Sequence, residues 1–223
     1  MSAKKRKLLI LAIGILVSGA AIGAWLLGNR YLGQTQSLGK VSDRIGKNAP
    51  FIKTPDPIVD RMIEMADLKE GDLAYDLGCG DGRIIITAAL KKKCRGIGFD
   101  IDPQRIAEAR ANAKQQGVDH LVEFRQQDIF TVDLDEADAV LMYLLPWMTR
   151  KLIPQLRELK PGARIVSHQF HLGDEPELKP ERTDLLPVEG DANNHFIHRW
   201  TAPLEGIKQR RQENELEPLP NVR

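Results

Sequence analysis

Residues 76–83 (Asp-Leu-Gly-Cys-Gly-Asp-Gly-Arg) combine the residue types and spacing best suited to hold a polar organic ligand. The segment follows a short apolar run and precedes a helix-like run, which is the order that opens a nucleotide-binding βαβ unit. Glycines at alternate positions let the backbone turn sharply and approach a ligand without an intervening Cβ. A turn built for pyrophosphate presents backbone N–H groups and little negative charge. Asp76 and Asp81 instead favour a ligand with positive charge and hydroxyl groups.

Two further carboxylates downstream narrow the ligand. Asp100 ends a second apolar run, 96–99, at the distance where a carboxylate typically accepts hydrogen bonds from both ribose hydroxyls. Asp128 follows a third such run and could accept a hydrogen bond from an adenine amino group, with Ile129 near the ring. S-adenosylmethionine carries an ammonium, a sulfonium, a ribose and an adenine. These residues therefore predict an S-adenosylmethionine site.

Other interpretations of the same residues are open. A dinucleotide turn has glycines at its first, third and sixth positions, whereas here they occupy the first, third and fifth and Arg83 takes the sixth. Asp81 alone would suit a helix N-cap, and Asp102 before Pro103 is equally a turn or cap residue. We assign no redox role to Cys79.

Strand-like and helix-like patterns alternate through the domain. Strands are predicted at 73–75, 96–99, 121–125, 137–144 and 163–167, and helices at 84–90, 104–116 and after Pro146. Alternation of this kind indicates helices on both faces of a mainly parallel sheet. The fold prediction is α/β: a Rossmann-like, doubly wound, seven-stranded, mostly parallel sheet, preceded by one N-terminal transmembrane helix.

Together with the Lys160-Pro161-Gly162 turn, these motifs resemble the class I, seven-β-strand S-adenosylmethionine-dependent methyltransferases. More narrowly, roughly residues 48–203 are similar to the membrane-associated protein-lysine methyltransferases, which include the ATP synthase c-subunit lysine methyltransferase and bacterial relatives. The segments that carry this narrower resemblance are 50–55, 143–146, 164–168 and 196–203, the last with Trp200 inside it. The resemblance implies methylation of a lysine amine of a membrane protein. The cofactor-binding residues expected are Thr54, Asp76, Gly78, Gly80, Gly82, Asp100, Ile101, Asp128 and Ile129.

The segment Tyr143–Pro146 stands where many members of the class hold the methyl acceptor. Enzymes that methylate planar nitrogens usually place Asn or Asp before Pro-Pro there, whereas this chain has Leu144 and Leu145. An apolar lip suits the aliphatic stem of lysine; alternatively, the two leucines only finish a buried strand. The predicted catalytic residues are Tyr143, Pro146 and His168. His168, His171 and Tyr143 are candidate proton acceptors, although a histidine after a strand is more often a surface or capping residue.

The N-terminal residues form a second informative feature. Residues 8–28 carry no charged side chain and as a helix would extend about 30 Å, which matches a bilayer core. Trp25 and Tyr31 stand where interfacial aromatics would. A signal peptide cleaved near Ser18-Gly19-Ala20 and a mitochondrial presequence are the alternatives. Four basic residues flank the segment on each side, so charge does not decide topology. The supply of cofactor places the catalytic domain on the cytoplasmic (or matrix) side.

Composition agrees with one enzyme domain. The predicted domains are an anchor at 1–28, a linker at 29–48, a methyltransferase domain at 49–204 and a charged tail at 205–223. A net charge of +1 gives no nucleic-acid footprint, and no His/Cys cluster has metal-ligand spacing. Expected partners are the membrane and a small membrane protein, with no nucleic acid and no metal. Two alternatives stay open: a lipid or quinone-like methyl acceptor, and a non-catalytic S-adenosylmethionine-binding scaffold.

Overall fold

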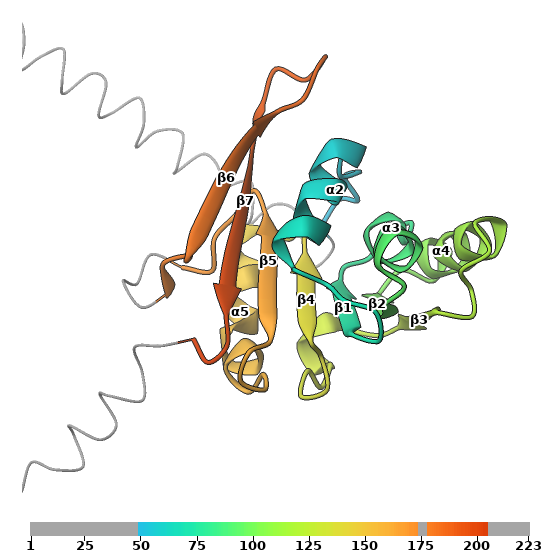
Figure 1. Ribbon diagram of the computed structural model, residues 1–223, viewed down its shortest axis with the longest axis horizontal. Helices are drawn as coiled ribbons and strands as arrows, with labels where there is room; N and C mark the ends of the chain where they lie inside the picture. The colour runs from blue at the N-terminus through green and yellow to red at the C-terminus, as the bar shows by residue number, and fades with distance from the viewer. Residues whose placement is uncertain (1–48, 174–177, 205–223) are drawn as a thin grey trace, which may run out of the picture. The chain divides into compact units, whose positions relative to one another are not determined.

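The computed structural model describes residues 49–173 and 178–204, which form a seven-stranded sheet with the order β3-β2-β1-β4-β5-β7-β6 (Figure 1). The elements are α2 (Asp56–Met65), β1 (Leu73–Leu77), α3 (Arg83–Lys92), β2 (Arg95–Asp100), α4 (Pro103–Gln115), β3 (Val122–Gln126), η1 (Ile129–Thr131), β4 (Ala139–Met142), α5 (Pro146–Arg157), β5 (Arg164–His168), β6 (Arg182–Pro187) and β7 (Asn194–Thr201).

The sheet confirms the predicted α/β class. Strands β3, β2, β1, β4 and β5 pair in parallel, and β7 runs antiparallel between β5 and β6. Neither α2 nor β6 was predicted from the sequence. Residues of β6 alternate between exposed and half-buried, so this edge strand lacks the apolar run by which the other strands were found.

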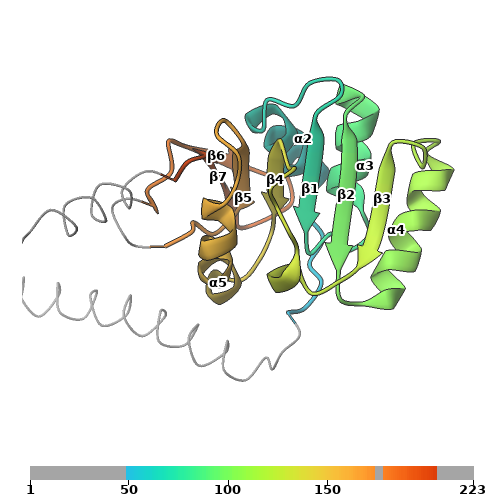
Figure 2. The same cartoon turned by 90° about the horizontal axis from the view of Figure 1, so that it is seen from below.

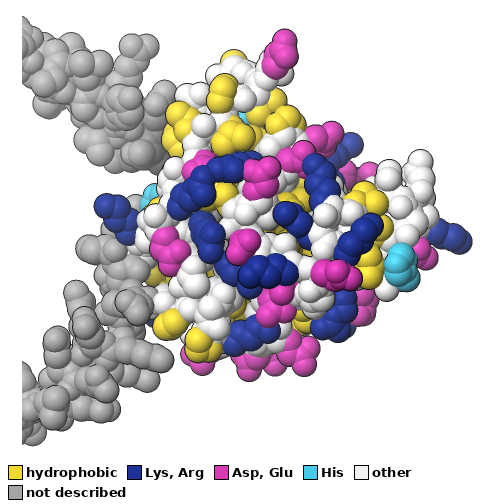
Figure 3. Space-filling view, viewed as in Figure 1, with side chains coloured by type: hydrophobic (Ala, Val, Ile, Leu, Met, Phe, Trp, Pro, Cys, Tyr) yellow, Lys and Arg dark blue, Asp and Glu magenta, His cyan; other side chains and the backbone are white. Residues whose placement is uncertain are grey.

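Helices cover both faces of the sheet (Figure 2). One apolar cluster contains buried residues of α2, α3 and α4, and a second contains residues of α5 and η1. Along β1 the two clusters take alternate residues, because successive side chains of a strand point to opposite faces: Ala74 belongs to the first and Tyr75 to the second. On the surface drawn in Figure 3, acidic and basic side chains are interspersed.

The strand predicted at 137–144 is shorter in the structure. Strand β4 ends at Met142, and α5 begins at Pro146 with Leu145 as its N-cap. A residue before proline is steered to extended geometry and proline fixes the first helical φ, so the apolar run is divided between strand and connection. Asp102 caps α4 as expected, because its side chain accepts a hydrogen bond from the Gln104 N–H at 2.8 Å.

The predicted anchor, linker and tail fall at 1–28, 29–48 and 205–223, outside the residues that the structure describes. Within 49–173 and 178–204, none of the helices has the length and apolar character needed to cross a bilayer.

Candidate active site

The glycine turn after β1 is fastened to the end of β2. The N–H groups of Gly78 and Cys79 both donate to the Phe99 carbonyl, at 2.8 and 2.9 Å. All three turn glycines have positive φ: 81° at Gly78, 53° at Gly80 and 80° at Gly82. Only glycine adopts this region without strain, so the alternation of glycines in the sequence corresponds to a real backbone requirement.

Asp76 is the most unusual group of the turn. Its side chain is buried, with 1% relative exposure, and neither carboxylate oxygen has a hydrogen-bond partner among the described residues. Burial, followed by the charges of Asp100 and Asp81, raises its pKa well above the ordinary value. Burying a carboxylate that accepts no hydrogen bond raises the free energy of the folded state. The arrangement fits a group that supplies N–H donors and positive charge, as the ammonium of S-adenosylmethionine does.

Asp100 lies beside the turn at the end of β2. Its Oδ2 accepts the N–H of Gly80 and its Oδ1 that of Asp102, both at 2.9 Å. A carboxylate oxygen has two lone pairs, so each retains capacity for a ribose hydroxyl. The Gln127 N–H donates to the Asp100 carbonyl at 3.0 Å, which brings the next segment alongside.

That next segment holds the predicted adenine contacts. Asp128 is exposed and its Oδ1 accepts the Phe130 N–H at 3.0 Å, while Ile129 is buried. Ile101 is 58% exposed directly after the end of β2. The predicted cofactor residues 76–82, 100–101 and 128–129 thus share the carboxyl edge of β1, β2 and β3, where α/β sheets bind ligands.

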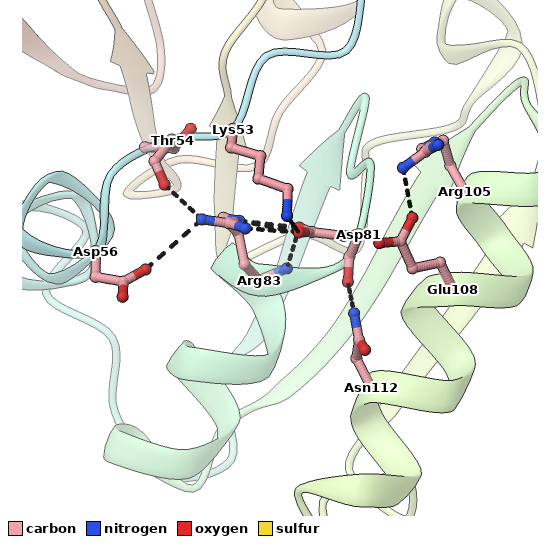
Figure 4. A network of polar contacts seen from close by, with 8 residues as sticks. All are labelled: Lys53, Thr54, Asp56, Asp81, Arg83, Arg105, Glu108 and Asn112. Atoms are coloured by element: carbon pink, nitrogen blue, oxygen red, sulfur yellow. Dashed lines mark hydrogen bonds and ion pairs between the residues drawn. The ribbon is translucent and has the colours of Figure 1, made fainter.

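Asp81 forms an ion pair with Arg83 at the start of α3 (Figure 4). Arg83 donates to its carboxylate from Nη2 at 2.7 Å and from Nε at 3.0 Å, and Lys53 lies 3.9 Å away. Although burial opposes ionisation, the hydrogen bonds and charge of Arg83 hold the pKa of Asp81 below its usual value. The N-cap position of α3 is Gly82, but Asp81 Oδ1 also accepts the backbone N–H of Arg83, the first residue of the helix, at 3.3 Å. Asp81 therefore serves the protein's own ion pair rather than a free ligand-facing charge.

Arg83 also holds the chain upstream of α2. Its Nη1 donates to the Thr54 carbonyl at 2.9 Å and lies 3.6 Å from Asp56 (Figure 4). Thr54 is buried. Phe51 lies against Gly80, where an added Cβ would meet its Cε2 at 2.1 Å, and the Arg105 guanidinium covers the ring at 4.8 Å. Residues 51–54 thus pack beside the turn, a role for Phe51 and Arg83 that no sequence pattern indicated.

Arg83→Lys is expected to loosen residues 51–54, because lysine cannot reproduce the forked contact to Asp81 together with the Thr54 bond. We expect a loss of about 1–2 kcal/mol in the free energy of unfolding and faster amide hydrogen exchange in this segment. Arg125→Lys is the control: its partner Glu123 is exposed, so the loss should stay below about 0.5 kcal/mol. Equal effects of the two substitutions would contradict the assignment.

The acceptor segment runs along the turn. Leu144 is 5% exposed, and a Cβ on Gly78 would lie 2.9 Å from its Cδ2, so Leu144 packs directly on the cofactor turn. Tyr143, Leu145 and Pro146 are half-buried. The two leucines therefore have different roles. Leu144 is a buried packing residue beyond the end of β4, whereas Leu145 is the N-cap of α5, which begins at Pro146.

Strand alternation places three predicted residues on one face of the sheet. Ala74, Leu141 and Val166 belong to the cluster under α2 and α3. Two residues further toward the carboxyl edge, the same face carries Asp76 on β1, Tyr143 just after β4 and His168 on β5. The rings of Tyr143 and His168 stack with centroids 4.1 Å apart, which confirms that these two predicted residues meet.

His168 is buried and hydrogen-bonded on one side only. Its Nε2 lies 2.9 Å from Nδ1 of His195, whereas its Nδ1 has no partner among the residues described. Burial, then the neighbouring His195 and His198, lowers its pKa to about 3, so the ring is neutral at physiological pH. His171 makes a different contact, from Nδ1 to the Gly173 carbonyl at 2.7 Å. Of the two candidate histidines, His168 is the one stacked on Tyr143.

The fold and this site define a class I S-adenosylmethionine-dependent methyltransferase. The ANTKMT methyltransferase domain model matches residues 76–181. A protein-lysine N-methyltransferase of Saccharolobus islandicus is 40% identical over 69% of this chain and 93% of its own length. The chain belongs to this protein-lysine N-methyltransferase family, and S-adenosylmethionine is its cofactor.

Two other similar proteins differ in what they are named for. The human ATP synthase c-subunit lysine N-methyltransferase is 28% identical over 70% of this chain, and the match covers 63% of the human protein. The crystal structure of an RNA methyltransferase from Salinibacter ruber, in complex with S-adenosyl-L-homocysteine, is 48% identical, with a TM-score of 0.62, over 70% of this chain and 96% of that one.

Proposed function

We propose that this enzyme transfers methyl groups to a lysine amine of a small membrane protein. The observation that carries the proposal is the uncharged wall made by the stacked rings of Tyr143 and neutral His168, on the sheet face that also holds Asp76. Such a wall suits the aliphatic stem of lysine. It lacks the Asn or Asp before Pro-Pro that grips planar nitrogens. Relatives named for lysine methylation of the ATP synthase c-subunit and of the adenine nucleotide translocase support the choice.

The chemistry requires a neutral amine in line with the donor methyl group. Methyl transfer is a displacement in which positioning supplies much of the acceleration. Lysine has an ordinary pKa of about 10.4, which an apolar wall and a nearby sulfonium would lower, because both disfavour the ammonium. The residues of this site therefore have to exclude water and orient the amine more than remove its proton.

The proposal extends to the location of the enzyme. Residues 8–28 act as a single membrane anchor, residues 29–48 as a linker and residues 49–204 as the catalytic domain on the cytoplasmic (or matrix) side, which contains the cofactor. An anchored domain would remain close to membrane-embedded substrates. Support comes from the uncharged length of 8–28 and from relatives named for membrane-protein substrates.

RNA is the second candidate acceptor, because the Salinibacter ruber protein is named an RNA methyltransferase. Two observations weigh against it. The acceptor segment reads Tyr-Leu-Leu-Pro, without a side-chain amide or carboxylate to hold a base. On the face shown in Figure 3, acidic side chains interrupt the basic ones, whereas nucleic acids favour continuous basic surfaces.

Intact-mass spectrometry of small membrane proteins from a deletion strain tests the proposal. We expect a membrane protein to lose the mass of one, two or three methyl groups, and purified enzyme with S-adenosylmethionine to restore it on a lysine. Enzyme carrying Asp100→Ala is the inactive control. Methyl incorporation only into total RNA would establish the second candidate, and a changed lipid extract would indicate a small-molecule acceptor.

A further inference from the structure

A chain of three side chains connects the surface with the buried edge of the site. Asp191 lies between β6 and β7, and its Oδ2 is 3.1 Å from Nε2 of His195. Nδ1 of His195 is 2.9 Å from Nε2 of His168. The carboxylate is 32% exposed, whereas His195 and His168 are buried at 7% and 0%. His195 is two residues from Ile197 of the α2-side cluster, so strand alternation places it on the face that holds His168.

The hydrogen bonds among Asp191, His195 and His168 fix which ring nitrogen of each histidine carries the proton. Oδ1 of Asp191 accepts the backbone N–H of Asn193 at 2.9 Å and its side-chain N–H at 2.8 Å. The Asn193 backbone bond, then the His195 bond, holds the pKa of Asp191 below its usual value. An ionised carboxylate only accepts hydrogen bonds, so His195 must carry its proton on Nε2. In the neutral His195 ring, Nδ1 is then an acceptor, which requires that His168 carry its own proton on Nε2.

Nδ1 of His168 is left as a bare lone pair. It is buried, and no hydrogen-bond donor reaches it from the described part of the chain. A buried acceptor without a donor is costly, because folding strips its water and returns no bond. In this molecule it shares its sheet face with Asp76, whose buried acceptors also have no donor. Both unpartnered sites lie toward the carboxyl edge, one on β1 and the other on β5.

We propose that Asp191 and His195 are positioning residues that fix the tautomer of His168, so that its Nδ1 accepts a hydrogen bond from an N–H of the substrate amine. This inference rests on the proposed lysine methylation. A neutral primary amine that donates one N–H to Nδ1 has its lone pair held in a fixed direction, which is what an in-line displacement requires. The low basicity of His168 suits a hydrogen-bond acceptor that does not take the proton.

The alternative is a structural role, in which the three side chains only join the β6–β7 hairpin to β5. Both roles predict loss of stability on substitution, so stability cannot separate them. The tautomer of His168 and the catalytic rate can distinguish the two roles. His168→Gln keeps an amide N–H to donate to His195 but removes the Nδ1 acceptor. Asp184→Asn is the matched control, because Asp184 joins the same hairpin to Arg61 of α2 without touching the histidines.

The test combines 15N NMR of histidine-labelled full-length enzyme with methylation kinetics. In the wild type bound to S-adenosylhomocysteine, we expect both His168 and His195 as Nε2–H tautomers, and n-butylamine at high pH should move the His168 Nδ1 resonance upfield. Asp191→Asn should mix the tautomers. Asp191→Asn and His168→Gln should each lower kcat roughly 100-fold and leave the affinity for S-adenosylhomocysteine unchanged. Asp184→Asn should keep wild-type kcat.

An Nδ1–H tautomer of His168 in the wild type would overturn the proposal, and so would an unshifted Nδ1 resonance at saturating butylamine. Unchanged kcat in His168→Gln would also overturn it. The tautomer and butylamine measurements need no protein substrate. They therefore remain decisive if the enzyme proves to methylate RNA, an outcome that would refute the proposed function while leaving the tautomer assignment to stand or fall separately.

Discussion

Asp76→Asn is expected to stabilise the ligand-free protein while removing most of its affinity for S-adenosylmethionine. The carboxylate is buried without a donor, so replacing it with a neutral side chain of the same shape relieves a desolvation cost. We expect a gain on the order of 1–2 kcal/mol in the free energy of unfolding at neutral pH. Loss of a charge-assisted bond to the cofactor should cost about 1.5–3 kcal/mol, or roughly 10- to 100-fold in Kd.

The gain in the free energy of unfolding of Asp76→Asn should depend on pH. The folded-state pKa of Asp76 is raised above the ordinary 3.8, so the folded protein binds more protons than the unfolded chain above that pH. Its stability therefore falls as pH rises from about 4. Asp76→Asn removes this loss, and its advantage over the wild type should grow between about pH 4 and 7. Urea denaturation at several pH values and calorimetric titration with S-adenosylhomocysteine measure both effects.

Asp81→Asn is the matched control, because this neighbouring carboxylate is buried but paired with Arg83. Removing its charge should destabilise the protein, the opposite of the effect at Asp76. A destabilised Asp76→Asn protein that binds S-adenosylhomocysteine with unchanged affinity would show that Asp76 is an ordinary structural carboxylate.

Gly82→Ala is expected to have the largest effect on folding. Gly82 has φ +80°, and an added Cβ would lie 2.8 Å from the Phe124 ring and 2.9 Å from the Ala109 Cβ. The left-handed conformation costs alanine about 1–2 kcal/mol, and overpacking typically adds about 1–3 kcal/mol. We expect a total loss of about 2–5 kcal/mol in the free energy of unfolding, measured by chemical denaturation.

Gly117→Ala separates the two contributions. Its φ is +70°, and an added Cβ would meet no atom within 4 Å. This variant should therefore lose only the conformational part, about 1–2 kcal/mol. Equal losses in the two variants would mean that Phe124 and Ala109 yield freely, and that close packing of α3 and α4 over the turn is unimportant.

Most of the predicted cofactor residues at the carboxyl edge of β1, β2 and β3 could be predicted because they lie close to one another in the sequence. A strand, a glycine turn and a carboxylate at the next strand end follow one another within one βαβ unit, and Asp128 follows the next strand along the chain. Spacing and residue type therefore suffice to predict Asp76, Asp100 and Asp128 as cofactor residues. The pairing of Asp81 with Arg83 is equally local, but spacing does not encode the direction of the Asp81 side chain. Phe51 reaches Gly80 from outside the unit, and no local pattern announces that contact.

The sequence by itself determined the class of fold and the donor of the methyl group, and it predicted Tyr143 and His168 as site residues, because each depends on short-range patterns or a family motif. Tertiary structure alone decided which side chains are buried without partners and which meet across strands. His195 is distant from His168 in the chain and contacts it only because β7 inserts beside β5, and Asp191 in turn contacts His195. An antiparallel insertion has no local signal, since long-range pairing depends on the packing of the whole sheet. The glycine turn identifies the donor, and the pairing of β5 with β7 brings His195 to His168.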